Sequence, residues 1–380
     1  MFVRGTWRVG RIAGVGIAIH PSWLIVYALF AWSAMFVAPL LDPHLKRGGA
    51  IGLGLAYAAL LFASVVVHEL SHALVARRLG MPIGNITLFL FGGVASIMRE
   101  PGSPAAEMQM AAAGPAASIV ISLVAFGLAL LTPDGWLNDL LLLLAYSNAA
   151  LAVFNLLPAF PSDGGRILRA LIWHFRRSQA RATASAGIVS LIVAAGLIVA
   201  GIYFALDGAR ATGEGMIAVR GWWWILIGLF WAQAALASIR GARVSLILET
   251  MPVGECMART IVPVPTTTTI AGFIAEMAVA GRGAAYPVVN NGEFVGLVTL
   301  QDTAAVPHAL WPHTPVTAVM TPAERTPRIP AQMPASDALE ALDARSVGEL
   351  PVFENGTLTG VVSKESIFTA VHARSKAAAA

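Results

Sequence analysis

The sequence is short of charged residues and almost free of cysteine. Only 12% of its 380 residues are charged, and Cys256 is the single cysteine. Soluble domains usually carry about 25% charged residues, so a chain this poor in charge is not expected to be wholly soluble. One cysteine excludes an internal disulfide, and a free thiol is typical of a reducing compartment. We interpret Cys256 as a passive, buried side chain.

The formal net charge is +4, but the basic residues are not arranged as in a nucleic-acid-binding protein. The basic residues flank apolar segments, and neither a basic stripe nor a series of stacking aromatic side chains accompanies them. We therefore expect no nucleic-acid partner.

Long apolar runs are abundant instead. Hydrophobic residues make up 57% of the chain and concentrate between residues 20 and 240, whereas residues 245–375 have the composition of a soluble protein. A run of about 20 apolar residues spans a bilayer. We therefore predict a polytopic α-helical membrane domain over residues 1–243. Its six predicted transmembrane helices are Ser22–Leu41, Ile51–Ala76, Ala105–Leu131, Trp136–Leu157, Ala184–Leu206 and Trp222–Ile239.

Basic residues are distributed unequally between the two ends of these helices. Since Lys and Arg favour cytoplasmic loops, the asymmetry predicts a multi-pass protein of the cell membrane with both termini in the cytoplasm. The side predicted to be cytoplasmic carries Arg4, Arg8, Arg11, Arg77, Arg78, Arg99, Arg166, Arg169, Arg176, Arg177, Arg181, Arg240 and Arg243, and the other side carries Lys46, Arg47, Arg210 and Arg220.

Residues 68–72 read His-Glu-Leu-Ser-His in the last third of the second apolar segment. Ionisable side chains are costly at membrane depth, so they persist mainly where they have a function. His68 and His72 share one helix face and can bind one Zn²⁺, while Glu69 can act on a water that the metal activates. The alternative, two histidines that only pack between helices, does not account for the adjacent glutamate. The pattern predicts a hydrolase with its metal inside the membrane.

A catalytic zinc site needs a third protein ligand, and Asp163 is the candidate. It follows two prolines and precedes two glycines just after the fourth apolar segment. Such residues break a helix and let the backbone fold back toward the membrane. The alternative is that Asp163 only caps a helix from Gly164 onward. Its place on the same predicted side as the two histidines favours the ligand.

Residues 83–98 predict a β-hairpin, because strand-forming side chains surround Gly92-Gly93. Open strand edges cannot face lipid, so we expect this hairpin to line a protein cavity near the metal.

The C-terminal part contains an internal repeat. Residues 286–296 (YPVVNNGEFVG) resemble residues 350–360 (LPVFENGTLTG) at a spacing of 64. Each copy reads as helix, strand, turn, strand and helix, which predicts two soluble α/β domains over residues 244–312 and 313–374. The low-complexity residues 375–380 are predicted to be a disordered tail.

Together these motifs resemble those of the site-2 protease family of intramembrane zinc metalloproteases. The opening residues 16–22 and the C-terminal repeat resemble the bacterial branch that carries tandem cystathionine-β-synthase (CBS) domains. The resemblance covers nearly the whole chain. The motifs that carry it are residues 68–72 (HELSH), 91–94 (FGGV), 113–115 (AGP) and 155–166 (NLLPAFPSDGGR).

The resemblance implies the roles of the site residues. His68, His72 and Asp163 would bind one Zn²⁺ per chain, and Glu69 would be the general base. Zinc would polarise the scissile carbonyl, and Glu69 would carry a proton from water to the leaving amine.

The resemblance also implies a substrate and residues that hold it. The substrate would be a membrane-spanning protein, such as an anchored regulator of transcription. Asn155 would hold the substrate or stabilise the oxyanion. The hairpin with Gly92 and Gly93 would steer an unwound substrate segment to the metal, because pairing with a strand keeps a peptide extended.

The CBS pair would be the regulator. Such pairs commonly bind ATP, ADP or AMP, and a contact stretch in the family reads Gly-x-x-Thr/Ser-x-x-Asp. The first repeat keeps Thr299 and Asp302, while the second has Ser363 but Ser366 in place of the aspartate. One nucleotide site would therefore be intact and the other weak or absent. A purely structural module that forms a homodimer stays an open alternative, because a fold alone does not establish a ligand.

Two positions depart from the family pattern: Ser162 stands where leucine is common, and Ser118 where asparagine is common. Neither position is itself a ligand, so we expect effects on packing or substrate contacts and not on catalysis. Two other functions compete with the protease: a metal-ion transporter gated by the CBS pair, and an inactive relative that binds membrane proteins.

Overall fold

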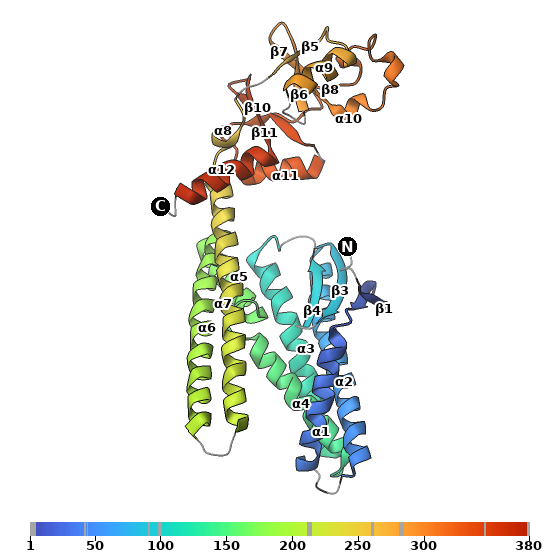
Figure 1. The fold of residues 1–380 in the computed structure, drawn as a ribbon, viewed down its shortest axis with the longest axis vertical. Coiled ribbons are helices and arrows are strands. Elements are labelled where there is room, and N and C mark those ends of the chain that lie inside the picture. Colours follow the sequence, from blue (N-terminus) through green and yellow to red (C-terminus); the bar gives the residue numbers. More distant parts are fainter. Residues whose placement is uncertain are drawn as a thin grey trace. The chain divides into compact units, whose positions relative to one another are not determined.

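The computed structural model describes residues 5–41, 43, 45–89, 92–97, 101–210, 215–259, 262–280, 285–345 and 347–377. The chain divides into two compact units, Met1–Arg240 and Gly241–Ala380 (Figure 1). The first contains the apolar helices, and the second contains the repeat.

The first unit is an assembly of apolar helices. Its first predicted span forms α1 (Trp23–Leu41). The part of α1 whose side chains are described, Trp23–Pro39, is apolar but shorter than the about 20 residues that usually span a bilayer. Among the described residues five helices reach spanning length, so the predicted count of six is not confirmed. The five are α2 (Arg47–Arg78), α3 (Pro104–Leu131), α4 (Trp136–Asn155), α6 (Gln179–Arg210) and α7 (Gly215–Thr250).

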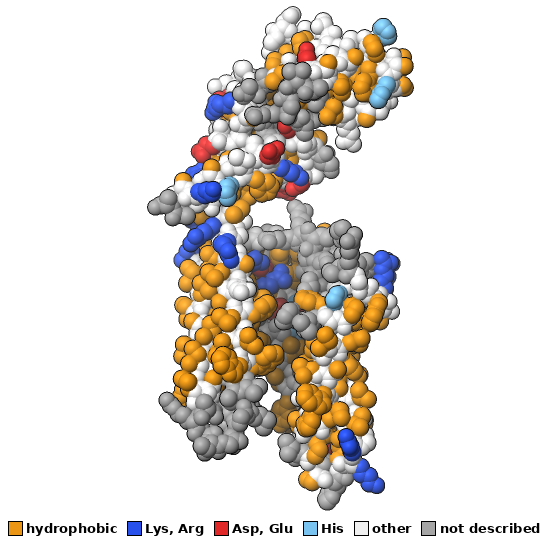
Figure 2. All heavy atoms as spheres, viewed as in Figure 1, with side chains coloured by type: hydrophobic (Ala, Val, Ile, Leu, Met, Phe, Trp, Pro, Cys, Tyr) orange, Lys and Arg blue, Asp and Glu red, His pale blue; other side chains and the backbone are white. Residues whose placement is uncertain are grey.

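The outward faces of these helices are apolar. Figure 2 shows hydrophobic side chains gathered over α6 and α7, and Ile192, Val199 and Leu226 are all more than half exposed. An apolar surface of this extent marks contact with a partner or with lipid. Together with the helix lengths, it identifies a membrane protein.

Local signals set the ends of α2 and α3. The side chain of Ser103 accepts a hydrogen bond from the backbone N–H three residues later, Pro104 is the first helical residue, and Glu107 lies in the first turn. All three features favour a helix start. α2 ends at Arg78, and Gly80 follows with a φ of +76°, a conformation that glycine adopts without strain.

A four-stranded sheet lies against α2. Its strands β1 (Trp7–Ile12), β2 (Val15–Ile19), β3 (Ile83–Phe89) and β4 (Gly92–Ile97) follow the order β1-β2-β3-β4. One face buries Val15, Ile86 and Leu88 against Ala73 of α2.

The predicted hairpin is present as the antiparallel pair β3–β4, but its turn is not at the two glycines. Gly92 and Gly93 begin β4, opposite Phe89 and Leu88. Glycine is tolerated in a strand and often marks close backbone approach, so the pair did not have to be a turn. Residues 90–91, with Phe91 of the motif, lie outside the described residues.

Strands β1 and β2 were not expected from the sequence. They are joined by Ala13 (φ 49°) and Gly14 (φ 82°), a two-residue loop whose left-handed conformations match the twist of an antiparallel pair. β1 has six residues and contains Gly10, and β2 has five and contains Gly16. Apolar and polar side chains therefore alternate over too few positions for a strand to be predicted.

Helix α2 is central to the packing of the first unit. Leu53 and Tyr57 of α2 are buried with Ala34 of α1 and Leu140 of α4. The Tyr57 hydroxyl also forms a 2.6 Å hydrogen bond with that of Ser147 on α4. Small residues at helix contacts allow this close approach in membranes.

The second unit repeats one sheet motif. The first sheet has β5 (Val264–Pro265), β6 (Ala285–Asn290), β7 (Glu293–Thr299) and β8 (Thr321–Pro322) in chain order, and the second has β9 (Ile329–Pro330), β10 (Glu349–Glu354) and β11 (Thr357–Ser363), ordered β11-β10-β9. The helices are α8 (Val253–Cys256), α9 (Ile270–Ala280), α10 (Leu300–Thr303), α11 (Ala335–Arg345) and α12 (Lys364–Ala377).

The turns of the two repeats are equivalent. Asn291-Gly292 joins β6 to β7 and Asn355-Gly356 joins β10 to β11, and all four residues have φ between 48° and 89°. This is the Asn-Gly hairpin turn. The strand–turn–strand repeat predicted from the sequence is therefore confirmed. Cys256 is 5% exposed in the core of the second repeat, as expected of a passive side chain.

Candidate metal centre

His68, His72 and Asp163 meet at one buried point of the first unit. The histidines lie one turn apart on α2, and Asp163 is the first residue of α5 (Asp163–Arg176). The two Nε2 atoms and Asp163 Oδ2 lie 3.3 Å from one another in all three pairs. Tetrahedral bonds of about 2.0–2.1 Å to zinc place neighbouring ligand atoms about 3.3 Å apart. The donor set and its spacing therefore fit zinc.

Each imidazole ring is held by a contact at Nδ1, while its Nε2 faces Asp163. His72 Nδ1 donates to the backbone carbonyl of Met110 at 2.7 Å, so its Nε2 lone pair is directed to the cluster. His68 Nδ1 lies 2.9 Å from the hydroxyl of Ser118. The expectation that Ser118 bears only on packing or substrate contacts is wrong: it contacts a proposed ligand, and such partners tune metal affinity.

Gly114 of α3 makes room for the cluster. A Cβ at this position would lie 2.2 Å from His72 Nε2 and 2.5 Å from His68 Nε2. This glycine belongs to the motif at residues 113–115, but the sequence alone assigned it no role. Its place directly before Pro115 inside a predicted helix is visible in the sequence, but nothing local indicates a contact with the histidines.

Asp163 is free to face the histidines because Ser162 caps α5. The Ser162 side chain accepts a hydrogen bond from the Gly165 N–H, so the alternative that Asp163 is the cap is wrong. Gly164 lets α5 start close to the preceding turn, since a Cβ there would lie 2.3 Å from the Leu157 carbonyl oxygen.

Glu69 is partly buried next to the cluster. Its carboxylate interacts electrostatically with His72, Asp163 and Arg166. A carboxylate beside three residues that could bind a metal has the position that a general base for a metal-activated water requires.

The residues expected to hold the substrate are less closely tied to this centre. Asn155 is the last residue of α4 and is partly exposed. Among the described residues, no hydrogen bond joins Asn155 to the three ligands. Gly92 and Gly93 lie in β4, and their role in steering a substrate stays a prediction.

In the second unit, the residues predicted to contact a nucleotide cap helices. Thr299 is the N-cap of α10, and Asp302 Oδ2 accepts hydrogen bonds from the Thr299 N–H and hydroxyl, both at 2.8 Å. At the start of α12, the Ser363 N–H donates to Ser366 Oγ and the Ser366 N–H donates to Ser363 Oγ, both at 3.1 Å. Ser366 thus accepts the hydrogen bond from the capping residue's N–H as Asp302 does, although it lacks the charge.

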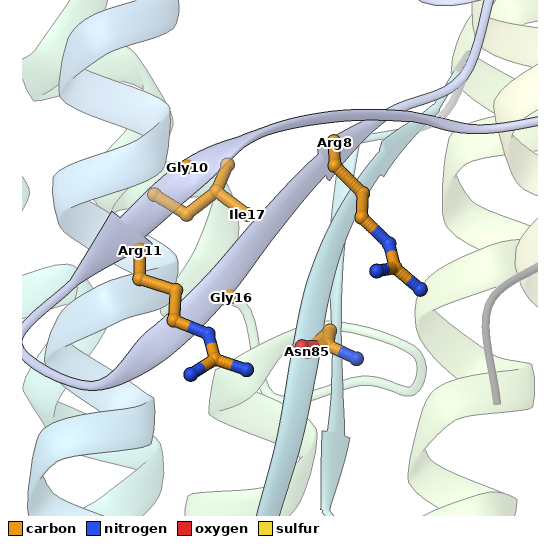
Figure 3. Close-up of a pocket in the computed structure, with 6 residues that line it drawn as sticks. All are labelled: Arg8, Gly10, Arg11, Gly16, Ile17 and Asn85. Carbon is orange, nitrogen blue, oxygen red and sulfur yellow. The ribbon is translucent and has the colours of Figure 1, made fainter.

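A separate basic recess of about 330 Å³ opens on the sheet (Figure 3). Arg8 and Arg11 would point to opposite faces of a regular strand, but a bulge between Arg8 and Gly10 brings them to the same side. Figure 3 shows both side chains directed to the side on which Asn85 lies. None of the proposed zinc ligands lines this recess, which is formed by Arg8, Gly10, Arg11, Gly16, Ile17 and Asn85.

The chain matches two family models. The model described as Peptidase family M50 matches residues 56–134 and 132–200, which include the histidine motif and Asp163. The CBS domain model matches residues 253–306 and 316–373.

The relatives of the chain carry related names. It is 30% identical to "Putative zinc metalloprotease sll0528" of Synechocystis, with 96% of this chain and 95% of the relative covered. It is 31% identical to "Putative zinc metalloprotease Rip3" of Mycobacterium tuberculosis, with 96% and 92% covered. Among solved structures, the site-2 protease from Methanocaldococcus jannaschii is 27% identical with a TM-score of 0.41, covering 62% of this chain and 95% of that one. The chain belongs to the site-2 protease family of zinc metalloproteases and carries a tandem pair of CBS domains.

Proposed function

We propose that this protease hydrolyses a peptide bond in or near a transmembrane segment of a membrane-anchored regulatory protein, at a zinc held by His68, His72 and Asp163. The observation that carries the proposal is the triangle of three ligand atoms 3.3 Å apart. The location of the histidines supports an intramembrane substrate, because both lie within a helix that is long and apolar enough to span a bilayer.

The protein residues have separable tasks. Bound zinc supplies Lewis acidity, which polarises the scissile carbonyl and acidifies water. Glu69 takes the proton from the attacking water and delivers it to the leaving nitrogen. Met110 and Ser118 hold the histidine rings in the orientation that presents Nε2 to the cluster.

Substrate handling falls to Asn155 and the β3–β4 hairpin. A helical substrate hides its carbonyls in internal hydrogen bonds, whereas a segment paired with a strand stays extended. β4 is an edge strand of the sheet, which supports this role for the backbone of Gly92 and Gly93. Asn155 offers an amide donor for the substrate carbonyl or the oxyanion.

We also propose that the enzyme lies in the cell membrane with both termini in the cytoplasm. The basic residues Arg77 and Arg78 at the end of α2 support this orientation by the positive-inside rule. The CBS repeats, over residues 244–312 and 313–374, modulate cleavage by binding an adenine nucleotide at Thr299 and Asp302. The CBS repeats of two chains also associate, which makes the enzyme a homodimer.

Zinc content and cleavage measured together test the proposal. Wild type and Glu69→Gln are purified and offered a panel of single-span membrane proteins, with and without ATP or AMP. We expect about one zinc per chain in both and cleavage in the wild type alone. Ser71→Ala is the matched control, since Ser71 lies inside the motif and, among the described residues, its hydroxyl bonds only to the Val67 carbonyl.

Two outcomes contradict the proposal. Well-folded wild type without zinc removes the metal centre, and cleavage by Glu69→Gln at the wild-type rate removes the assigned base. A transporter instead predicts zinc flux into vesicles with no cleavage product.

A further inference from the structure

A fully buried carboxylate on α3, that of Glu107, lies one helical turn before Met110, whose carbonyl contacts His72. Glu107 is 0% exposed, and its Oε1 accepts a 2.7 Å hydrogen bond from Arg169 Nε as well as a contact from Arg169 Nη2. Arg166 Nε lies 3.9 Å from the same oxygen. A buried charge persists where it is paired, and the fork of an arginine fixes direction as well as distance. This ion pair joins α3 to α5.

Both arginines lie within the first two turns of α5, close to Asp163. At about 100° per residue, Arg166 lies about 60° from Asp163 around the helix, and Arg169 lies about 120° from it. Arg169 also lies over the Phe160 ring, 5.9 Å from its centre, which ties this part of α5 to the segment that enters the helix. α5 is therefore held against α3 within two turns of Asp163.

The same face of α3 also orients both histidines. Glu107, Met110, Gly114 and Ser118 follow one another at helical spacing and are all buried. Met110 and Ser118 hold the rings of His72 and His68, and Gly114 leaves the space between them. One helix face thus contacts every element that carries a proposed zinc ligand.

We propose that Glu107 is a positioning residue: through Arg169, with Arg166 beside it, it fixes α5 on α3 and so sets the place of the Asp163 carboxylate. This inference rests on the proposed zinc centre. Glu107 contacts neither zinc nor substrate in this proposal. Arg169 links α5 to Glu107, in addition to being one of the basic residues on the side predicted to be cytoplasmic.

Zinc affinity measured by chelator competition, without substrate, tests the inference. We expect Glu107→Gln to weaken zinc binding by about 10–100-fold, the range seen when supporting groups around a metal are removed. Arg169→Lys keeps the charge but loses the fork, so it should weaken binding by a smaller factor. The matched control is Asp343→Asn, which breaks the exposed Lys364–Asp343 pair and should leave zinc affinity unchanged.

A charge exchange separates positioning from general damage. Glu107→Arg and Arg169→Glu should each weaken zinc binding, and the double variant should recover to within about tenfold of wild type, because paired residues are not additive. If Glu107→Gln does not fold, Arg169→Lys decides alone.

The results separate a failure of the positioning role of Glu107 from a failure of the proposed zinc centre. If Asp163→Asn binds zinc as well as wild type does, the metal centre itself fails. If Asp163→Asn loses zinc while Glu107→Gln or, where that variant does not fold, Arg169→Lys keeps wild-type affinity, the centre stands and the positioning role of Glu107 is overturned.

Discussion

Among single residues, the metal centre depends most on the missing side chain at Gly114. We predict that Gly114→Ala abolishes stoichiometric zinc binding and cleavage, because the new methyl group would overlap both Nε2 atoms. The matched control is Gly127→Ala on the same helix, where a Cβ meets nothing within 4 Å. The control should keep zinc and gain up to about 1 kcal/mol of stability. Metal analysis of the two purified variants checks the prediction, and zinc at one per chain in Gly114→Ala would refute it.

The residues proposed to bind zinc were easier to find from the sequence than the residues that contact and support them. The spacing of His68 and His72 is a helical period, and Asp163 stands out among helix-breaking residues. Gly114 and Ser118 carry no such signal, because their roles depend on how α3 is rotated against α2. That rotation is a product of packing between helices and leaves no local pattern.

At the scale of elements, the residues in the turns determined which strands could be predicted from the sequence. The Asn-Gly turns predicted the hairpins of the soluble repeat, whereas β1 and β2 are joined by Ala13-Gly14, which is not a typical hairpin sequence. The helices of the membrane unit follow from apolar length, although over its described residues α1 does not reach spanning length. Long periodic segments are thus predictable, and short glycine-containing strands are not.

The hairpin turns make a prediction about the second unit. Gly356 has a φ of +82°, so Gly356→Ala forces an L side chain into the left-handed region. We expect the free energy of unfolding to fall by about 1 kcal/mol, which lowers the melting temperature by about 3 °C. Thermal unfolding of the full chain measures the change. Gly241→Ala, in helix α7 with nothing within 4 Å of its Cβ, should not lower it, and an equal loss in both variants would contradict the turn argument.

At the scale of the whole molecule, the orientation of the chain in the membrane can be tested by labelling introduced cysteines. Because the native Cys256 is buried, it should add little background to such labelling. Burial raises the pKa of this thiol, so little thiolate forms at neutral pH and the native chain should react slowly with maleimides. Lys46→Cys and Leu79→Cys flank α2, whose 32 residues at about 1.5 Å each reach across a bilayer.

We predict that a membrane-impermeant maleimide labels Lys46→Cys in intact cells and Leu79→Cys only after permeabilisation. The physical reason is that Lys and Arg favour the cytoplasmic side, and Arg77 and Arg78 lie in the last turn of α2. The unsubstituted chain is the control for background. The reverse labelling pattern would invert the proposed orientation.

The shared face of α3 has a consequence for how the family can vary. Glu107, Met110, Gly114 and Ser118 depend on their order around one helix. An insertion or deletion of one residue between them would turn everything beyond it by about 100° and separate the contacts on its two sides. Related sequences can therefore exchange the lipid-facing residues of this helix freely, but its length between Glu107 and Ser118 should stay fixed. Gaps in an alignment of relatives belong in the loops outside it.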